Sequence, residues 1–344
     1  MSFDPDSDSL PKRAELPDIP GAPKGAAWFW GKDDELGRLN LLTPRRRREA
    51  AKLVESGETV NLDWPLNLPN PPAFGREPFE WKVKSLGPAG NDDLYQMNSQ
   101  SGSQWDGFRH VSIANGGGYV FYNNLTQDEI MNTTRCGIQA WADHGIVGRG
   151  VLIDYWSYAL QNNKKYDPNE THPISTSELL ACAKAQGLTF QYGDILMIRT
   201  GWIDNYQRLD QDSRASIAKG TGVYDFKFVG VEVSEEMVDF LHDNYFAAVA
   251  SDSPAFESWP TPYDWNHHLY LLPRWGCPIG EMWDFEKLAD ACKRHGRYHF
   301  FFVSSPSNVP GKALSPAQRL ESISLTFSHF PGGVGSHPNA MAIF

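Results

Sequence analysis

The sequence predicts a mixed α/β fold in one large domain. Short apolar runs of strand length recur along the chain, and segments with helix-capping residues lie between them. No linker-like stretch divides the chain after residue 25, and neither an internal repeat nor a low-complexity tract is present. With 344 residues, 41% of them hydrophobic and 13% aromatic, the chain is long enough to bury a sizeable core. We therefore expect one domain over residues 26–344.

The N-terminal part contains four recognisable segments. Residues 1–25 are rich in Asp, Pro and Ser, which predicts a flexible lead-in. A helix is predicted to begin at Thr43-Pro44, because Thr is a good N-cap and Pro fits the first helical position. This helix should end before Gly57, and the run TVNLDWPL should follow as a strand. Residues 66–93 are rich in Pro, Gly and Asn and are predicted to form a long loop.

The rest of the chain alternates between the two kinds of element. Buried strands are predicted where apolar runs follow a glycine or a turn, at 148–156, 193–202, 245–254 and 297–306. Helices are predicted at 176–187 and 234–244.

Charge and cysteine content exclude several classes of protein. The formal charge of -11 argues against non-specific binding to nucleic acid or to an acidic membrane. No run approaches 18 apolar residues, and the N-terminus has no apolar signal region, so a cytoplasmic protein is expected. The four cysteines lie far apart without a CxxC pair, which predicts core residues: Cys136, Cys182, Cys277 and Cys292.

The stretch SGSQWDGFRH, residues 101–110, gathers polar side chains of catalytic type. Asp106 and His110 are four residues apart, a spacing that places two side chains on one face of a turn entering a helix. Such a pair can bind a metal or act as a base with its neighbour. The alternative is a turn whose polar groups only satisfy one another.

A second group of metal-ligand types lies downstream, in DWNHHLYLLPRWGCPIGEMWDF. His267, His268 and Glu281 are ordinary ligand types for zinc or manganese. Their spacing is not diagnostic by itself, and a core histidine with a surface glutamate is the alternative. The glycine-rich GGGY at 116–119 is not expected to bind phosphate, because it lacks the Lys-Ser/Thr of a phosphate-binding loop.

At these residues the chain resembles the cyclase family, which includes bacterial kynurenine formamidase and isatin hydrolase. The resemblance extends from residue 30 to residue 344 in order. It is carried by WGKDDELGRLNLLTP, SGSQWDGFRH, GRGVLIDYW, GDILMIRTGW, HLYLLPRWGCPIGEMWDFEKL, FFVSSPSNVPG and GGVGSHPNAMAIF. It implies a compact α/β domain of the swivelling β/β/α type, with a β-rich, barrel-like core flanked by helices. It also implies a homo-oligomer.

The family signature H-x-G-T-H-x-D-x-x-x-H can be placed on residues 100–110. Gln100 and Gln104 then stand where the family has its two first-metal histidines. Asp106 and His110 match the Asp and the last His, while His268 and Glu281 match a distant His and Glu. The resemblance therefore implies a divalent metal, Zn²⁺ or Mn²⁺, held by Asp106, His268 and Glu281. Gln104 and Gln100 are weak ligands at most, because an amide oxygen is a poorer ligand than imidazole.

The resemblance also implies an activity, namely hydrolysis of an amide, lactam or lactone in a small, often aromatic substrate. The best-known example is the arylformamidase reaction of tryptophan catabolism. His110 would act as general base and then acid, a role that suits an imidazole. Trp105 and Phe108 could form a substrate wall with Trp28 and Trp30, or be ordinary core aromatics.

Arg109 could bind a substrate carboxylate, or form a structural ion pair. Two other functions remain open. The chain could be a catalytically altered family member that binds a small metabolite, or it could serve as an assembly partner. Residues 312–331 interrupt two family-like segments, which predicts an inserted loop or a retained intron.

Overall fold

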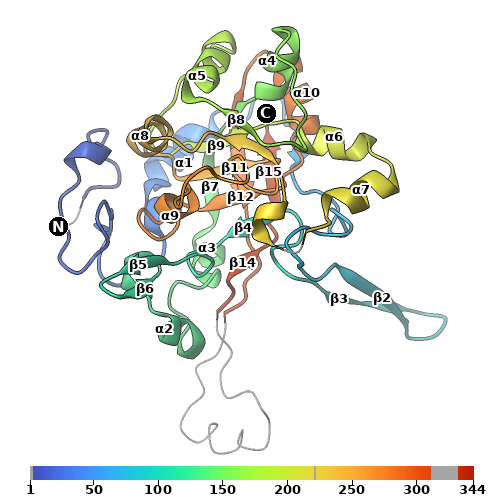
Figure 1. Cartoon of the computed structure of the whole chain (residues 1–344), viewed down its shortest axis with the longest axis horizontal. Helices are drawn as coiled ribbons and strands as arrows, with labels where there is room; N and C mark the ends of the chain where they lie inside the picture. The colour runs from blue at the N-terminus through green and yellow to red at the C-terminus, as the bar shows by residue number, and fades with distance from the viewer. Residues whose placement is uncertain (1–2, 221, 311–331) are drawn as a thin grey trace, which may run out of the picture.

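A computed structural model describes residues 3–220, 222–310 and 332–344. Its centre is a nine-stranded mixed sheet that curls into a half-barrel, with helices packed around it (Figure 1). This arrangement confirms the predicted α/β domain with a barrel-like core. The strands lie in the order β1 (Thr59–Asn61), β15 (Ala340–Ile343), β13 (His299–Ser304), β7 (Ile146–Ile153), β9 (Ile195–Ile198), β11 (Ala248–Ser251), β12 (Ile279–Glu281), β4 (Gln104–Asp106) and β14 (Gly335–Ser336).

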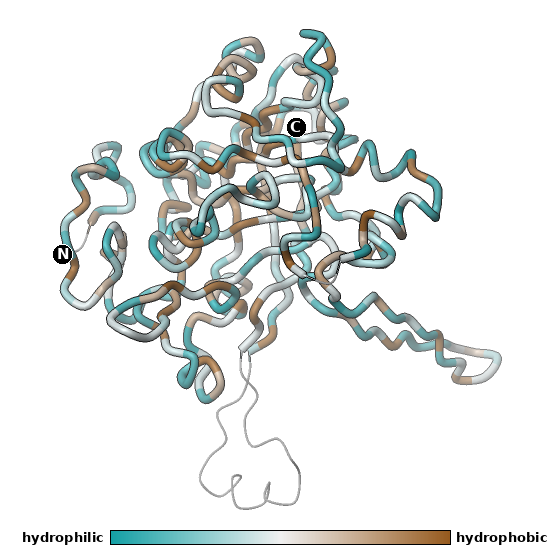
Figure 2. The backbone as a smooth tube through the Cα atoms, viewed as in Figure 1, coloured by the Kyte–Doolittle hydropathy of each residue, from teal (hydrophilic) through white to brown (hydrophobic). Residues whose placement is uncertain are grey.

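The middle of the sheet is parallel and its two ends are antiparallel. Strands β7, β9, β11 and β12 run parallel to one another, and every residue of β9 and β11 is buried. Such strands are covered on both faces, which explains why they are continuous apolar runs in the sequence. The four predicted strands at 148–156, 193–202, 245–254 and 297–306 are confirmed as β7, β9, β11 and β13. Figure 2 shows this apolar centre within a more hydrophilic periphery.

The three predicted helices also form, and the first begins with the expected N-cap. Thr43 accepts a hydrogen bond from the backbone N–H of Arg46 at the start of α1 (Pro44–Ala51), which ends earlier than predicted. Ser175 and Ser234 cap α5 (Thr176–Ala185) and α8 (Glu235–Asp243) in the same way. The other α-helices are α2 (Gln127–Asn132), α3 (Gln139–His144), α4 (Tyr155–Gln161), α6 (Trp202–Arg208), α7 (Gln211–Ile217), α9 (His268–Leu271) and α10 (Glu286–His295).

Short elements connect these parts. Two small pairs are β5 (Ile113–Asn115) with β6 (Gly118–Val120), and β8 (His172–Ile174) with β10 (Val229–Val231). Short 3₁₀ helices lie at Arg13–Glu15, Gly37–Leu41, Tyr122–Asn124 and Val223–Asp225. All four cysteines are free and buried, as predicted. Within the described residues, no helix is long and apolar enough to cross a membrane.

The predicted loop at 66–93 is wrong in its second half. Residues Glu80–Ser85 (β2) and Asn91–Gln96 (β3) form an antiparallel hairpin that projects from the body like an arm (Figure 1). Every residue of both strands is exposed. Cross-strand pairs such as Trp81 with Tyr95 hold the hairpin together instead of burial in the core. The buried-strand pattern used for the prediction is therefore missing here.

The N-terminal segment also differs from the expected flexible lead-in. Leu10 is buried in the main core. The guanidinium group of Arg13 lies 2.6 Å from Glu235 and 2.5 Å from Asp239, both on α8. One apolar anchor and two ion pairs thus attach a segment whose overall composition is polar. The predicted insertion at 312–331 lies outside the described residues.

Candidate metal centre

Two neighbouring strands place three of the polar side chains on one face of the sheet. Side chains alternate along a strand, so Gln104 and Asp106 project from the same face of β4 while Trp105 projects from the other. Strand β12 pairs with β4 so that Glu281 lies opposite Gln104. Because opposite residues in an antiparallel pair share a face, Glu281 joins Gln104 and Asp106.

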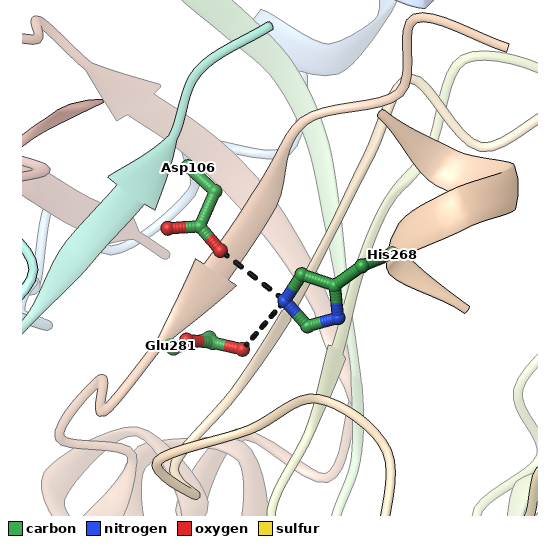
Figure 3. Close-up of side chains that lie close together, drawn as sticks. All are labelled: Asp106, His268 and Glu281. Carbon is green, nitrogen blue, oxygen red and sulfur yellow. Dashed lines mark ion pairs between the residues drawn. The ribbon is translucent and has the colours of Figure 1, made fainter. Parts of the chain in front are cut away.

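His268 completes the group from the start of helix α9. Its Nε2 lies 3.2 Å from Oε1 of Glu281 and 3.5 Å from Oδ2 of Asp106 (Figure 3). The three potential ligand atoms lie within 4.8 Å of one another. The structure thus brings together Asp106, His268 and Glu281, which are 162 and 13 residues apart in the chain.

Glu257 orients the imidazole and was missed from the sequence. Its carboxylate is fully buried, and both oxygens lie 2.9 Å from Nδ1 of His268. A carboxylate on one ring nitrogen fixes the tautomer and leaves the other nitrogen for a metal. The sequence held one indication of this role. Glu257 lies in DSPAFESWP, directly after a predicted buried strand, and a buried carboxylate needs a polar or charged partner.

Gln104 presents its amide hydrogens, not its oxygen, to the two carboxylates. Its Nε2 donates to Oδ1 of Asp106 at 2.9 Å, to Oε2 of Glu281 at 3.0 Å and to Oε1 of Gln100 at 2.9 Å. The opposite orientation would place an amide oxygen against carboxylate oxygens, which is repulsive. In this arrangement Gln104 is a hydrogen-bond donor to two candidate ligands and does not act as a ligand itself.

Gln100 lies one step further from the carboxylates. It is buried, and its side-chain oxygen accepts the hydrogen bond from Gln104. Its Nε2 has no hydrogen-bond partner among the described residues, and the same holds for Oε1 of Gln104. The two amides therefore form a pair that reaches the carboxylates only through Gln104.

The electrostatics of the group follow from burial and mutual charge. Burial opposes ionisation of Asp106, but the charge of His110 and the hydrogen bond with His268 outweigh it and lower the pKa of Asp106 to about 2. Burial and the neighbouring Asp106 charge raise the pKa of Glu281 to about 7. Burial also disfavours a charged His268, yet the three surrounding carboxylates raise its pKa well above the ordinary value. Without a metal, the cation among these carboxylates is an imidazolium.

His110 lies beside the group, at the end of a tight turn. Its backbone N–H donates to the carbonyl of Gly107 at 3.0 Å, and no helix follows, unlike the predicted turn into a helix. Its ring centroid is 6.4 Å from that of His268. Burial lowers the pKa of His110 despite the opposing charge of Asp106. A neutral imidazole with one accepting nitrogen is the form that a general base requires.

The aromatic residues predicted to bind substrate lie in the core instead. Trp105 is fully buried on the opposite face of β4, where its ring centroid is 4.6 Å from that of Trp283 and its Nε1 donates to Ser304. Phe108 is fully buried against Tyr122. Both residues are therefore core aromatics, which was the alternative to a substrate wall.

Arg109 does not fit the predicted role of binding a substrate carboxylate. It is buried, and its guanidinium group donates hydrogen bonds to the backbone carbonyls of Ile130, Thr133, Arg135 and Gly332. These contacts use its Nε and both terminal nitrogens. Arg109 therefore holds a loop in place, which a motif-based comparison of sequences does not reveal.

The donor set suits a divalent cation. One imidazole nitrogen and two carboxylate oxygens are usual ligands for Zn²⁺ and Mn²⁺, and three protein ligands leave coordination positions open. Oδ2 of Asp106 is buried, and its contact with Nε2 of His268 is long, at 3.5 Å. A bound cation would satisfy this oxygen and replace the proton on His268.

Comparisons with known proteins agree with this fold. No curated protein sequence matches the chain. A crystal structure described as a novel cyclase is 28% identical, with a TM-score of 0.75 over 93% of this chain and 99% of that one. Isatin hydrolase A from Ralstonia solanacearum is 15% identical, with a TM-score of 0.54 over 83% and 91%.

An isatin hydrolase bound to the product analogue thioisatinate is 14% identical, with a TM-score of 0.52 over 85% of this chain and 93% of that one. Because these identities are low, the likeness to the two isatin hydrolases shows only that this chain shares their fold. The family model described as putative cyclase matches residues 49–258, more than half of the chain. The chain therefore belongs to the cyclase family.

Proposed function

We propose that this protein is a metal-dependent hydrolase of a small amide, lactam or lactone, with arylformamidase-like chemistry. The carrying observation is the convergence of Asp106, His268 and Glu281 within 4.8 Å, with His110 beside them. Membership of the cyclase family and a fold shared with isatin hydrolases support the same reaction class. Zn²⁺ and Mn²⁺ are the candidate metals.

Asp106, His268 and Glu281 would hold one divalent cation. When bound, such a cation lowers the pKa of water toward neutrality and polarises a carbonyl group. Glu257 would keep the imidazole of His268 turned toward the two ligand carboxylates. Gln104 would hold one oxygen of each carboxylate by hydrogen bonds, so that the other oxygens face His268.

His110 would move the protons. As a neutral imidazole, it would take a proton from the attacking water and then donate it to the leaving nitrogen or oxygen. The low pKa that burial gives to His110 favours the neutral, accepting form before the reaction. The ring of His110 lies beside that of His268, with 6.4 Å between the ring centroids, so it is near the proposed metal.

A second candidate function is a family member that binds a small metabolite without hydrolysing it. The observation in its favour is the replacement of two signature histidines by Gln100 and Gln104, because the amide hydrogens of Gln104 already bond to both carboxylates. In this state the ion pairs between His268 and the two carboxylates would be permanent.

Metal analysis and three variants separate these functions. Protein purified without a metal-binding tag should contain about one Zn²⁺ or Mn²⁺ per chain by mass spectrometry. E281A and H268A should both lose the metal, and a chelator should abolish hydrolysis of formanilide or of a lactone. H110Q should keep the metal and lose about 10²–10⁴-fold in kcat.

His295→Gln is the matched control, since His295 pairs with Glu58 at the surface and should keep both metal and activity. Unchanged turnover in H110Q would remove His110 from the mechanism. A protein that binds no metal after reconstitution would favour the metabolite-binding function.

A further inference from the structure

Arg76 is a cation beside the candidate site that no carboxylate neutralises directly. It is half-buried, and its Nη1 donates to the backbone carbonyl of Gln100. Its guanidinium carbon lies 5.1 Å from the centroid of the Phe74 ring. Among the described residues, no aspartate or glutamate forms an ion pair with it, in contrast to Arg13, Arg149 and Arg199. Arg76 is therefore positioned by a backbone carbonyl and an aromatic ring.

Contacts connect Arg76 to the candidate metal ligands. The residue whose carbonyl it binds, Gln100, accepts a hydrogen bond from Gln104, which in turn donates to Asp106 and Glu281. Arg76 is thus joined to the carboxylates of Asp106 and Glu281 through Gln100 and Gln104.

The guanidinium group has donors left for a ligand. One nitrogen contacts Gln100, while the others have no hydrogen-bond partner in the described chain and are not buried. Arg109 differs in that its donors are used by backbone carbonyls. A planar guanidinium group with two free nitrogens matches the two oxygens of a carboxylate.

We propose that Arg76 binds an anionic group of the substrate, so that the protein selects small amides or cyclic amides that also carry a carboxylate. This inference rests on the proposed function and names its substrate class. Arg76 would touch the substrate at a distance from the reacting carbonyl. It would also place a positive charge where the carboxylates of the site alone would repel an anion. The role that Arg109 was expected to play thus falls to a different arginine, 33 residues earlier in the chain.

Binding of two matched probes tests the anchor without relying on turnover. Benzenesulfonate offers an anion to arginine but coordinates metals weakly, and phenyl methyl sulfone is its neutral counterpart. Titration calorimetry on the metal-loaded protein should show that the anion binds at least about tenfold more tightly. R76Q should lose this preference, while its affinity for the neutral sulfone should stay the same. R76K should keep part of it, because it retains charge but not the planar fork.

Two measurements rule out a purely structural effect. Metal content should be equal in the wild type, R76Q and R76K, which shows that loss of the Gln100 contact leaves the ligands in place. The matched control is Arg208→Gln, because Arg208 is an exposed partner of Asp204 on α6 and should bind both probes normally. Equal weakening of both probes in R76Q, or no preference for the anion in the wild type, would overturn the anchor.

Kinetics then distinguish failure of the anchor from failure of the proposed function. With formanilide and 2-formamidobenzoate as substrates, R76Q should raise KM about tenfold for the carboxylate-bearing compound only, at unchanged kcat. Hydrolysis of both substrates without a difference between wild type and R76Q would overturn the anchor and leave the hydrolase. Sulfonate binding that depends on Arg76, in a protein that hydrolyses neither compound, would support the anchor and overturn the hydrolase.

Discussion

Nδ1 of His268 lies 2.9 Å from both carboxylate oxygens of Glu257, and Nε2 of the same ring faces Asp106 and Glu281. Glu257 is fully buried, so its charge has no solvent to stabilise it. Burial would raise the pKa of Glu257, but His268 outweighs burial and lowers it. The pair therefore fixes the imidazole in one orientation and increases its basicity toward a metal.

Replacement of Glu257 by glutamine should weaken metal binding without removing a ligand. An amide of the same shape can still contact Nδ1, but it provides no charge to polarise the ring. We expect about a 10–100-fold loss in affinity for Zn²⁺, measured by competition with a chromogenic chelator. Glu170→Gln removes a comparable carboxylate from an exposed pair with Lys227 and should leave the affinity unchanged. An E257Q protein with wild-type affinity would show that the contact is only structural.

The double variant Q100H/Q104H should acquire a second metal site. Nε2 of Gln104 already lies 2.9–3.0 Å from oxygens of Asp106 and Glu281, so an imidazole at this position would face the same carboxylates. Imidazole is a far better ligand than an amide for Zn²⁺. Metal content by mass spectrometry should rise from about one to about two ions per chain.

A histidine introduced elsewhere provides the control for this gain. Gln161 ends helix α4 and is exposed, so Q161H adds a histidine without approaching the carboxylates. Its metal content should equal that of the wild type. If the double variant also keeps a single ion, the amide pair is not the reason for the reduced site.

The sheet was predictable because its middle strands are buried on both faces. Runs such as 195–198 are continuously apolar, and this pattern reflects burial alone. The β2–β3 hairpin was not predictable in this way, since its residues are exposed and its stability comes from pairing across the two strands. Local patterns thus identify elements of the core and miss elements outside it.

The candidate site could be predicted in its ligands but not in its surroundings. Asp106, His268 and Glu281 came from the family resemblance, and the structure places them together. Strand alternation alone could have excluded Trp105, which must project opposite Gln104 and Asp106. The contact of Glu257 with His268 depends on a loop and a helix meeting in space, which spacing along the chain does not encode.

The hairpin arm exposes an apolar face, and we therefore expect the protein to self-associate through it. Trp81, Val83 and Tyr95 share that face and are 62%, 50% and 60% exposed. An isolated two-stranded hairpin is marginally stable in water, so a covering partner is expected. A second copy of the chain fits, because the exposed apolar face of one arm can pack against the same face of another arm. A twofold axis along the strands would place β2 of one arm against β3 of the other.

The variant W81S/Y95S should therefore shift the protein toward the monomer in light scattering. Leu160→Ser, which removes a similarly exposed apolar side chain from α4, should leave the mass unchanged. A wild-type protein that is monomeric at high concentration would contradict this prediction.

His242 is a buried histidine that should make stability depend on pH. Its ring is fully buried on α8, with its centroid 4.9 Å from that of Trp275 and its Nδ1 2.9 Å from Asp243. The buried guanidinium group of Arg38 lies over the same Trp275 ring and donates to the carbonyl of His242. Burial and this neighbouring cation outweigh Asp243 and lower the pKa of His242 to about 4.

The folded protein therefore binds the His242 proton less tightly than the unfolded chain, whose histidine has a pKa near 6.5. This contribution to stability is fully present above pH 6.5 and is lost as the pH falls toward 4. Between pH 7.5 and pH 5 the loss should be about 2 kcal/mol, and it approaches about 3 kcal/mol near pH 4. Urea unfolding of wild type and H242Q at both pH values measures this difference, with H295Q as the surface control. A wild type and an H242Q variant that lose equal stability over this range would show that His242 is not the group responsible.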